Sequence, residues 1–245
     1  GFTSAGLIGL FQGMGLALGS SMATFVPNFL ISFTTFSIKE FFCAFAGVGI
    51  LMLLISKKPM IKNIATAIIG FSLIFIGMSL IGDGTTFFST SPAIIDFFHT
   101  LTNPFLLILL GVLFTLITQS SLATIAFIMT MVGTAGFMGV ISIQSAAYIV
   151  YGSNLGSALT TAFLIYFSSN IEGKRIGVFH IFVTLFGTIL FGTLSILPWI
   201  DTLYFWVAEP TFKVAFINLT FNLVTGIIVL PLLKPAMYLI KKIMP

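Results

Sequence analysis

The feature that most limits the fold of this chain is the absence of charge over long stretches of sequence. Between Phe97 and Ile171 there are 75 residues without Asp, Glu, Lys or Arg, and only 7% of the whole chain is charged. A soluble domain carries about 25% charged residues. Further uncharged runs approach the roughly 20 apolar residues that a spanning helix needs, and the alternating pattern of a membrane barrel is absent. We therefore expect an all-α integral membrane protein.

The uncharged runs predict a series of spans and one hairpin. The expected spans cover residues 6–36, 40–56, 63–82, 141–168, 176–197 and 214–233, the first broken near Gly19 and the fourth near Gly152. A hairpin over about 104–136, broken at Gln119–Ser121, lies between the third and fourth spans. Its first arm, Pro104–Thr118, would be only about 23 Å long at about 1.5 Å per residue. That is short for a full crossing, so we expect a re-entrant hairpin.

Charged residues between the spans predict which face of the protein lies in the cytoplasm. Threading the chain through the expected spans gives one face 2 basic residues, Lys39 and Lys213, and the other face 8. These 8 are Lys57, Lys58, Lys62, Lys174, Arg175, Lys234, Lys241 and Lys242. Because basic residues gather on the cytoplasmic side, we expect a cytoplasmic C-terminus and an external loop over 83–103, where Asp83 caps a helix end or binds nothing. A multi-pass protein of the bacterial inner (plasma) membrane is the expected setting.

Two polar clusters interrupt the long uncharged run. The first is Gln119-Ser120-Ser121, and the second is Gly152–Ser157, which is followed by Thr160 and Thr161. Hydroxyls and amides at membrane depth are costly unless they bind something or one another. Two such clusters in one hydrophobic run indicate a path or a site for a polar solute.

The second cluster has a weak counterpart near the start of the chain. The segment Gly19–Thr24 parallels Gly152–Ser157, and the residues that follow are also similar once one gap is allowed. Broken helices in two inverted repeats are a common plan of transporters. The counterpart of Gln119-Ser120-Ser121 would then precede residue 1, which is Gly, so we expect the start of the natural protein to be missing. The chain would divide into the remainder of a first repeat over 1–60, a second repeat over 61–200 and a final span with its tail over 201–245.

These motifs resemble those of the sodium–phosphate cotransporter family, that is, the type II cotransporters and their bacterial relatives. The family is marked by a Gln-Ser-Ser-Ser hairpin followed by a Gly-(Ala/Ser)-Asn-Ile-Gly-Thr broken helix, and both motifs occur here in that order. The chain departs from the pattern at Leu122, where a third serine is usual, and at Ser157, where threonine is usual. In the first half, Ser21 and Ala23 replace the usual Asn and Gly. The resemblance implies an inverted-repeat transporter with a re-entrant hairpin and broken helices, which carries inorganic phosphate by sodium-coupled symport.

The candidate phosphate site lies at the start of the second hairpin arm. A helix that begins near Ser121 offers free backbone N–H groups and a positive dipole end to an anion. We expect phosphate to contact Gln119, Ser120 and Ser121, and also Ser20 and Ser21 of the first repeat.

The candidate sodium site is expected beside it. Sodium prefers oxygen ligands, and an unwound Gly152–Ser157 segment would free backbone carbonyls for it. The expected side-chain ligands are Gln119, Ser121, Asn154, Ser157 and Thr160. Apart from sodium as the coupling ion no cofactor is expected. Phosphate, sodium and the lipid bilayer are the expected partners, without nucleic acid, and a homodimer is left open.

Other interpretations remain open at this stage. Serine and threonine in membrane helices usually bond their own backbone or a neighbouring helix, and Gly19 and Gly152 could be packing contacts. His180 lies inside an expected span, where we favour a neutral bond between helices. The same scaffold could carry or export another oxyanion, or could be a non-transporting membrane scaffold with a degenerate site. An enzyme is not expected, because no carboxylate pair, metal-ligand cluster or Ser–His–Asp arrangement lies inside a span.

Overall fold

Helices and the turns between them make up the part of the chain that the structure describes. The computed structural model describes residues 1–32, 39–133, 139–168 and 170–244, and no strand occurs among them. In chain order the helices are α1 (Leu10–Ala23), α2 (Phe25–Ser32), α3 (Lys39–Ile55), α4 (Pro59–Thr90), α5 (Pro92–Thr100), α6 (Pro104–Thr118), α7 (Ser121–Met131), α8 (Ile143–Ser168), α9 (Ile171–Leu194), α10 (Trp199–Leu203), α11 (Pro210–Val229), the 3₁₀ turn η2 (Leu230–Leu232) and α12 (Leu233–Ile243). Four of these helices begin at a proline, whose missing N–H is not needed in a first turn.

Three described segments are long and apolar enough to cross a membrane. They are Pro59–Gly77, Ile171–Leu194 and Pro210–Ile243, while α3, α6 and α7 are apolar but shorter. The helix α8 is not among the three, although it has 26 residues. These segments support a multi-pass helical membrane protein, and they are fewer than the six spans that the sequence predicts.

The first expected span, 6–36, is broken at Thr24 and not near Gly19. α1 ends at Ala23 and α2 begins at Phe25, so the helix is continuous through Gly19. Pro27 accounts for this position, because its ring clashes with the carbonyl four residues earlier and it has no N–H to donate. The end of the expected span, 33–36, lies outside the described residues.

The expected break near Gly152 is wrong. α8 runs without interruption from Ile143 to Ser168. A Cβ atom on Gly152 would lie 2.0 Å from the Ile108 carbonyl oxygen, and one on Gly156 would lie 2.9 Å from the Val112 carbonyl oxygen. Small residues let helix backbones approach closely within membranes. The glycines of this motif therefore pack α8 against α6 and leave the helix intact.

The expected external loop over 83–103 is largely helical. α4 continues past Asp83 to Thr90, and α5 occupies Pro92–Thr100. Asp83 therefore lies within α4 and not at its end. An aspartate inside a helix costs only about 0.7 kcal/mol relative to alanine, so the helix can continue through it. A charge thus marked the end of the apolar run without ending the helix. The other expected spans agree with α3, α9 and α11 to within a few residues.

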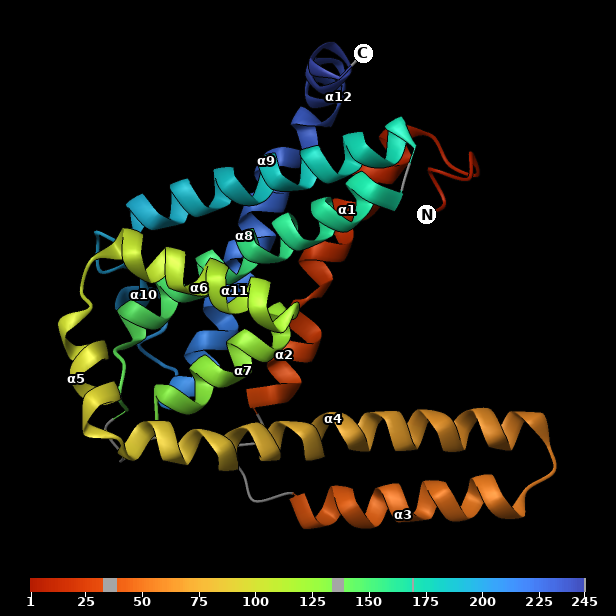
Figure 1. Cartoon of the computed structure of the whole chain (residues 1–245), viewed down its shortest axis with the longest axis vertical. Helices are drawn as coiled ribbons and strands as arrows, with labels where there is room; N and C mark the ends of the chain where they lie inside the picture. Colours follow the sequence, from red (N-terminus) through yellow and green to blue (C-terminus); the bar gives the residue numbers. More distant parts are fainter. Residues whose placement is uncertain (33–38, 134–138, 169, 245) are drawn as a thin grey trace.

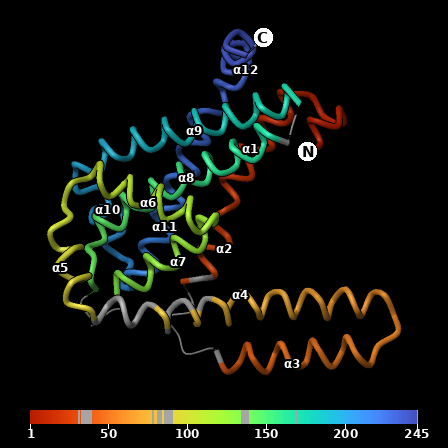
Figure 2. The backbone as a smooth tube through the Cα atoms, viewed as in Figure 1, coloured from red at the N-terminus to blue at the C-terminus, as the bar shows by residue number. Residues whose placement is uncertain are grey.

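The helices form a body and a projecting pair. α3 packs along α4, and this pair extends away from the other helices (Figures 1 and 2). In the body, α8 packs between α6 and α9 (Figure 1), and the core includes Tyr151 of α8 stacked on Phe221 of α11. Figure 1 also shows α5 and α10 at one end of the molecule, with the α3–α4 turn, the end of α8 and the start of α9 at the opposite end.

Candidate functional site

The Gln119-Ser120-Ser121 segment separates two helices, as the sequence predicts. α6 ends at Thr118 and α7 begins at Ser121. Gln119 has the left-handed backbone angles φ 54 and ψ 22, and it is the one described non-glycine residue with a positive φ. Such a conformation costs a side-chain-bearing residue about 1–2 kcal/mol and is concentrated at functional sites. The strained residue therefore lies in the segment that sequence motifs single out.

The start of α7 presents unused hydrogen-bond donors. Ser120 is its N-cap, and the Ser120 hydroxyl oxygen accepts a bond of 3.1 Å from the backbone N–H of Ala123. The N–H of Thr124 donates to the Ser120 carbonyl oxygen at 3.1 Å. The N–H groups of Ser121 and Leu122 are then left at the open end of the helix, where the helix dipole is positive. A Ser120 hydroxyl that accepts a bond can still donate its own proton.

The end of α6 presents the opposite polarity on the other side of the same break. The last four carbonyls of a helix have no partner within it, and they carry the negative end of its dipole. In α6 these are the carbonyls of Thr115–Thr118. Within the described part of the chain, the side chains of Gln119 and Ser121 form no hydrogen bond with another residue. The break thus brings together the C-terminal end of α6, which favours a cation, and the N-terminal end of α7, which favours an anion. It also holds two polar side chains that have no hydrogen-bond partner among the described residues.

Threonine hydroxyls join the two arms of this helix pair. The hydroxyl groups of Thr115 in α6 and Thr124 in α7 lie 2.9 Å apart, and both residues are fully buried. The Thr118 hydroxyl of α6 lies 3.4 Å from the same Thr124 hydroxyl. Figure 1 shows α7 folding back beside α6, so these bonds hold a hairpin. Their role is structural, and they fix the geometry of the break.

Contact between α6 and α8 brings the second motif toward the break. A Cβ on Gly111 of α6 would lie 2.2 Å from the Ile149 carbonyl oxygen of α8, so the backbones touch. Gly156 lies beside Thr115, one turn before α6 ends. The two helices run in the same direction (Figure 1), so Ser157 and Thr160 extend toward the end of α6.

The hydroxyl groups of this motif differ in their bonding. The Thr160 hydroxyl donates to the Gly156 carbonyl oxygen at 2.9 Å, and the Thr161 hydroxyl donates to the Ser157 carbonyl oxygen at 2.8 Å. The Ser157 hydroxyl forms no hydrogen bond with another described residue. Since α8 is unbroken, its carbonyls are held within the helix, and the expected supply of free carbonyls at Gly152–Ser157 is absent.

Asn154 belongs to a buried cluster that the sequence reasoning missed. Its amide nitrogen donates to the Asn218 side-chain oxygen at 2.9 Å, and its own side-chain oxygen accepts from Asn222 at 3.1 Å. Asn218 and Asn222 lie on α11 and are 0% and 6% exposed. Their spacing of four residues within an apolar run puts both amides on one helix face, which is the signal that could have revealed them.

Ser20 and Ser21, the candidate phosphate ligands of the first repeat, lie on α1. Ser20 is exposed, whereas the Ser21 hydroxyl lies 3.2 Å from Nε2 of His180 in α9 and donates to the Ala17 carbonyl oxygen at 3.1 Å. This contact joins α1 to α9, as we expected of His180. Among the described residues no hydrogen bond joins Ser20 or Ser21 to the α6–α7 break. No described residue would lie within 4 Å of a Cβ on Gly19, so this glycine makes no packing contact with the described part of the chain.

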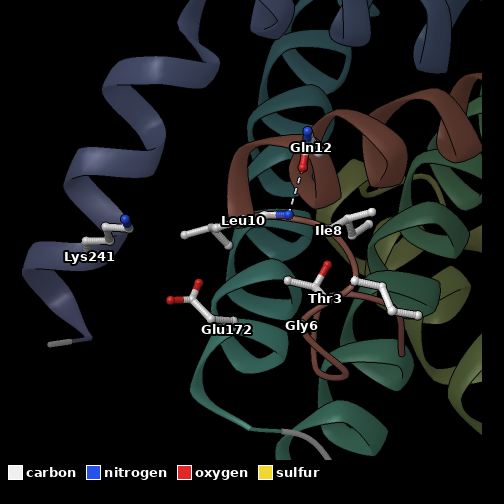
Figure 3. Close-up of a pocket in the computed structure, with 9 residues that line it drawn as sticks. Thr3, Gly6, Ile8, Leu10, Gln12, Glu172 and Lys241 are labelled. Carbon is white, nitrogen blue, oxygen red and sulfur yellow. Dashed lines mark hydrogen bonds between the residues drawn. The ribbon is translucent and has the colours of Figure 1, made fainter.

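A pocket of about 380 Å³ lies elsewhere, between the N-terminal segment, the start of α9 and Lys241 of α12 (Figure 3). Its polar lining includes Thr3, Gln12 and Glu172, and the Gln12 side-chain oxygen accepts from the Gly9 backbone N–H at 2.7 Å. None of the residues predicted to bind phosphate or sodium lines it.

Helix ends that meet at one point within a helical membrane body are typical of secondary transporters. This chain belongs to the Na+/Pi-cotransporter family, whose family model matches residues 1–83 and 91–226. The resemblance seen in the two sequence motifs is thereby confirmed.

Several curated proteins are similar to the chain over most of its length. The "Uncharacterized protein YqeW" of Bacillus subtilis (strain 168) is 25% identical over 252 residues, which cover 100% of this chain and 77% of that protein. The "Putative inorganic phosphate export protein YjbB" of Escherichia coli (strain K12) is 26% identical over 242 residues, which cover 96% of this chain and 42% of that protein. The chain thus spans less than half of YjbB. No solved structure matches the chain.

Proposed function

We propose that this protein is a sodium-coupled symporter that moves inorganic phosphate across the cell membrane. The break between α6 and α7 supports the proposal best, because one helix end there suits an anion and the other suits a cation. Membership of the Na+/Pi-cotransporter family and the similarity to a protein named for inorganic phosphate export favour phosphate as the substrate.

Phosphate would bind at the start of α7. The free N–H groups of Ser121 and Leu122 would donate to its oxygens, as helix N-termini do for other phosphates. The hydroxyls of Ser120 and Ser121 and the amide of Gln119 would add further donors. Ser20 and Ser21 of α1 stay proposed contributors from the first repeat, whose α2 contacts α7, although Ser21 lies against His180 of α9 in this structure.

Sodium would bind at the end of α6. Because α8 is continuous, the backbone ligands come from the open carbonyls of Thr115–Thr118 and not from α8. Gln119, Ser121, Asn154, Ser157 and Thr160 would supply side-chain oxygens. The Thr160 hydroxyl donates to its own helix, which leaves lone pairs of its oxygen for a cation.

The neutrality of the site gives a reason for coupling. No charged residue occurs between Phe97 and Ile171, so no side chain there can balance a bound phosphate. An isolated ion in a low-dielectric site is very costly, and a nearby ion of opposite sign reduces that cost. Sodium and phosphate would therefore bind together more readily than either binds alone.

The orientation and the two-repeat division are parts of the same proposal. A cytoplasmic C-terminus follows from the split of 8 basic residues against 2 between the two faces. In a background lacking Cys43, a cysteine at position 241 should resist an impermeant thiol reagent in intact cells, and one at position 96 should react. Labelling of position 241 from outside would contradict the orientation.

A second candidate function is phosphate export by the same scaffold. It is favoured by the name of the YjbB relatives, "Putative inorganic phosphate export protein". Uptake and efflux of labelled phosphate, measured in opposite sodium gradients, would distinguish the two directions.

Phosphate uptake in proteoliposomes tests the proposal. An inward sodium gradient should drive uptake of labelled phosphate, while a choline gradient should not. The double variant Ser157→Ala with Thr160→Val should need more sodium for half-maximal uptake, because it loses ion ligands. Thr161→Val is a matched control on the same helix, since the Thr161 side chain is exposed and bonds only its own backbone. Sodium-independent uptake in the wild type would contradict the coupling.

A further inference from the structure

We propose that the pocket beside α12 binds the phosphate of an anionic phospholipid headgroup at the membrane surface. The pocket has a volume of about 380 Å³ and lies between the N-terminal segment, the start of α9 and Lys241 of α12 (Figure 3). None of the residues that we assign to the transport of phosphate or sodium lines it. This inference therefore does not depend on the proposed function.

The pocket lies at the level where an apolar span begins. α9 is a candidate span over Ile171–Leu194, and Glu172 in its first turn lines the pocket. The Arg175 guanidinium, also at the start of α9, donates to the Met244 carbonyl oxygen from Nε at 3.0 Å and from Nη2 at 2.8 Å. These bonds hold the end of α12 beside the start of α9. Both helices therefore meet where the hydrocarbon of a bilayer gives way to headgroups.

The residues of α12 suit the surface of a membrane better than its interior. α11, with 20 residues, is already about 30 Å long, which matches the hydrocarbon core of a bilayer. The η2 turn with Pro231 follows, and α12 then packs its buried Leu233 and Ile240 against the body. Leu239 and Ile243 stay exposed. The helix also carries exposed lysines, which are Lys234, Lys241 and Lys242. A basic amphipathic helix of this kind lies in the interface and attracts anionic headgroups.

Side chains that can donate hydrogen bonds to a phosphate group line the pocket. Lys241 is exposed, and its ammonium group forms no ion pair with a described residue. The Thr3 hydroxyl has no hydrogen-bond partner in the described part of the chain. The Gln12 side chain uses its oxygen, which accepts from the Gly9 N–H at 2.7 Å, and its nitrogen is left to donate. Lys241 lies on the opposite side of the pocket from Thr3 (Figure 3), so a phosphate between them could accept from both.

The charge and the apolar rim of the pocket favour an anionic lipid. Glu172 is the acid of the lining, and its carboxylate pairs with the Arg175 guanidinium at 2.5 Å, which neutralises it. Lys241 therefore gives the lining its net positive charge. Leu7 also lines the pocket and is 70% exposed, so it offers an apolar surface to an acyl chain. A phospholipid uses both features, whereas a free phosphate uses only the charge.

Thermal unfolding of the purified protein in a nonionic detergent with added lipid tests this site. Tryptophan fluorescence would follow unfolding while phosphatidylglycerol, or phosphatidylcholine with the same acyl chains, is titrated in without sodium or inorganic phosphate. Phosphatidylglycerol should raise the Tm of the wild type, because a ligand that binds the folded state stabilises it, and phosphatidylcholine should not. Lys241→Gln should raise the half-saturating phosphatidylglycerol concentration about fivefold, since it removes one lysine from an anionic ligand. Lys241→Glu should abolish the Tm rise.

Lys242→Gln is the matched control, because Lys242 is the next residue of α12, is also exposed and does not line the pocket. It removes the same charge and should leave the half-saturating concentration close to that of the wild type. Equal losses in Lys241→Gln and Lys242→Gln would show diffuse attraction to a basic helix and would overturn the pocket. Equal stabilisation by the two lipids would also overturn it. A Tm rise with inorganic phosphate in choline that Lys241→Gln abolishes would make the occupant a free phosphate and contradict the lipid.

Discussion

Two polar segments interrupt the same uncharged run of this chain and differ in structure. Gln119–Ser121 breaks the chain into α6 and α7, whereas Gly152–Ser157 lies in the unbroken α8. At the first segment a left-handed Gln119 ends one helix and the Ser120 hydroxyl caps the next. At the second, two glycines touch the backbone of α6. The comparison teaches that a break needs residues that cap the helix ends, while glycine in a membrane helix can equally serve close packing.

The largest effect is expected from filling the glycine contact. Gly152→Ala would put a Cβ 2.0 Å from the Ile108 carbonyl oxygen, which is backbone and cannot rotate away. Overpacking of this kind typically costs about 1–3 kcal/mol or more. The Tm and the yield of monodisperse protein should both fall. Gly19→Ala is the matched control, because none of the described residues lies within 4 Å of the added atom. Equal losses in the two variants would refute the packing role of Gly152.

A smaller effect is expected at the cap of α7. Ser120→Ala removes the hydroxyl that accepts from the Ala123 N–H, and the loss of such a cap costs about 1 kcal/mol. Ser121→Ala removes a hydroxyl with no hydrogen bond to another described residue, so thermal unfolding should change little. Calorimetry of both variants checks the difference. A stability loss in Ser121→Ala as large as that in Ser120→Ala would show that the two serines share one structural role.

The smallest effect is expected at Gln119. Glycine tolerates a φ of 54, so Gln119→Gly should relieve about 1–2 kcal/mol of backbone strain. The greater conformational freedom of glycine in the unfolded chain offsets most of this gain, so the Tm should rise only slightly. The substitution should also increase the sodium concentration needed for half-maximal phosphate uptake, because the amide oxygen is lost. Gln119→Asn tolerates the same backbone region and keeps an amide, which makes it the control. A lower Tm in Gln119→Gly would mean that the side chain supports the break.

The sequence allowed the all-helical class, the family and the break at Gln119–Ser121 to be predicted, because polar residues in an apolar run have few alternatives. It could not distinguish the two uses of glycine at Gly152, since that depends on whether α6 lies against the helix. The predicted loop after Asp83 was wrong for a similar reason, because a charged residue ends an apolar run but does not end a helix. Asn218 and Asn222 were overlooked because their partner, Asn154, comes from a distant part of the chain.

Phosphate binding to the purified protein, measured by isothermal titration in sodium and in choline, tests the central claim most directly. The account predicts that phosphate binds in sodium and at least tenfold more weakly in choline, where no cation offsets its charge. Ser121→Ala should weaken binding in sodium by about tenfold while its unfolding stays close to that of the wild type. Equal phosphate affinity in the two salts, together with wild-type affinity in Ser121→Ala, would contradict a coupled site at the α6–α7 break.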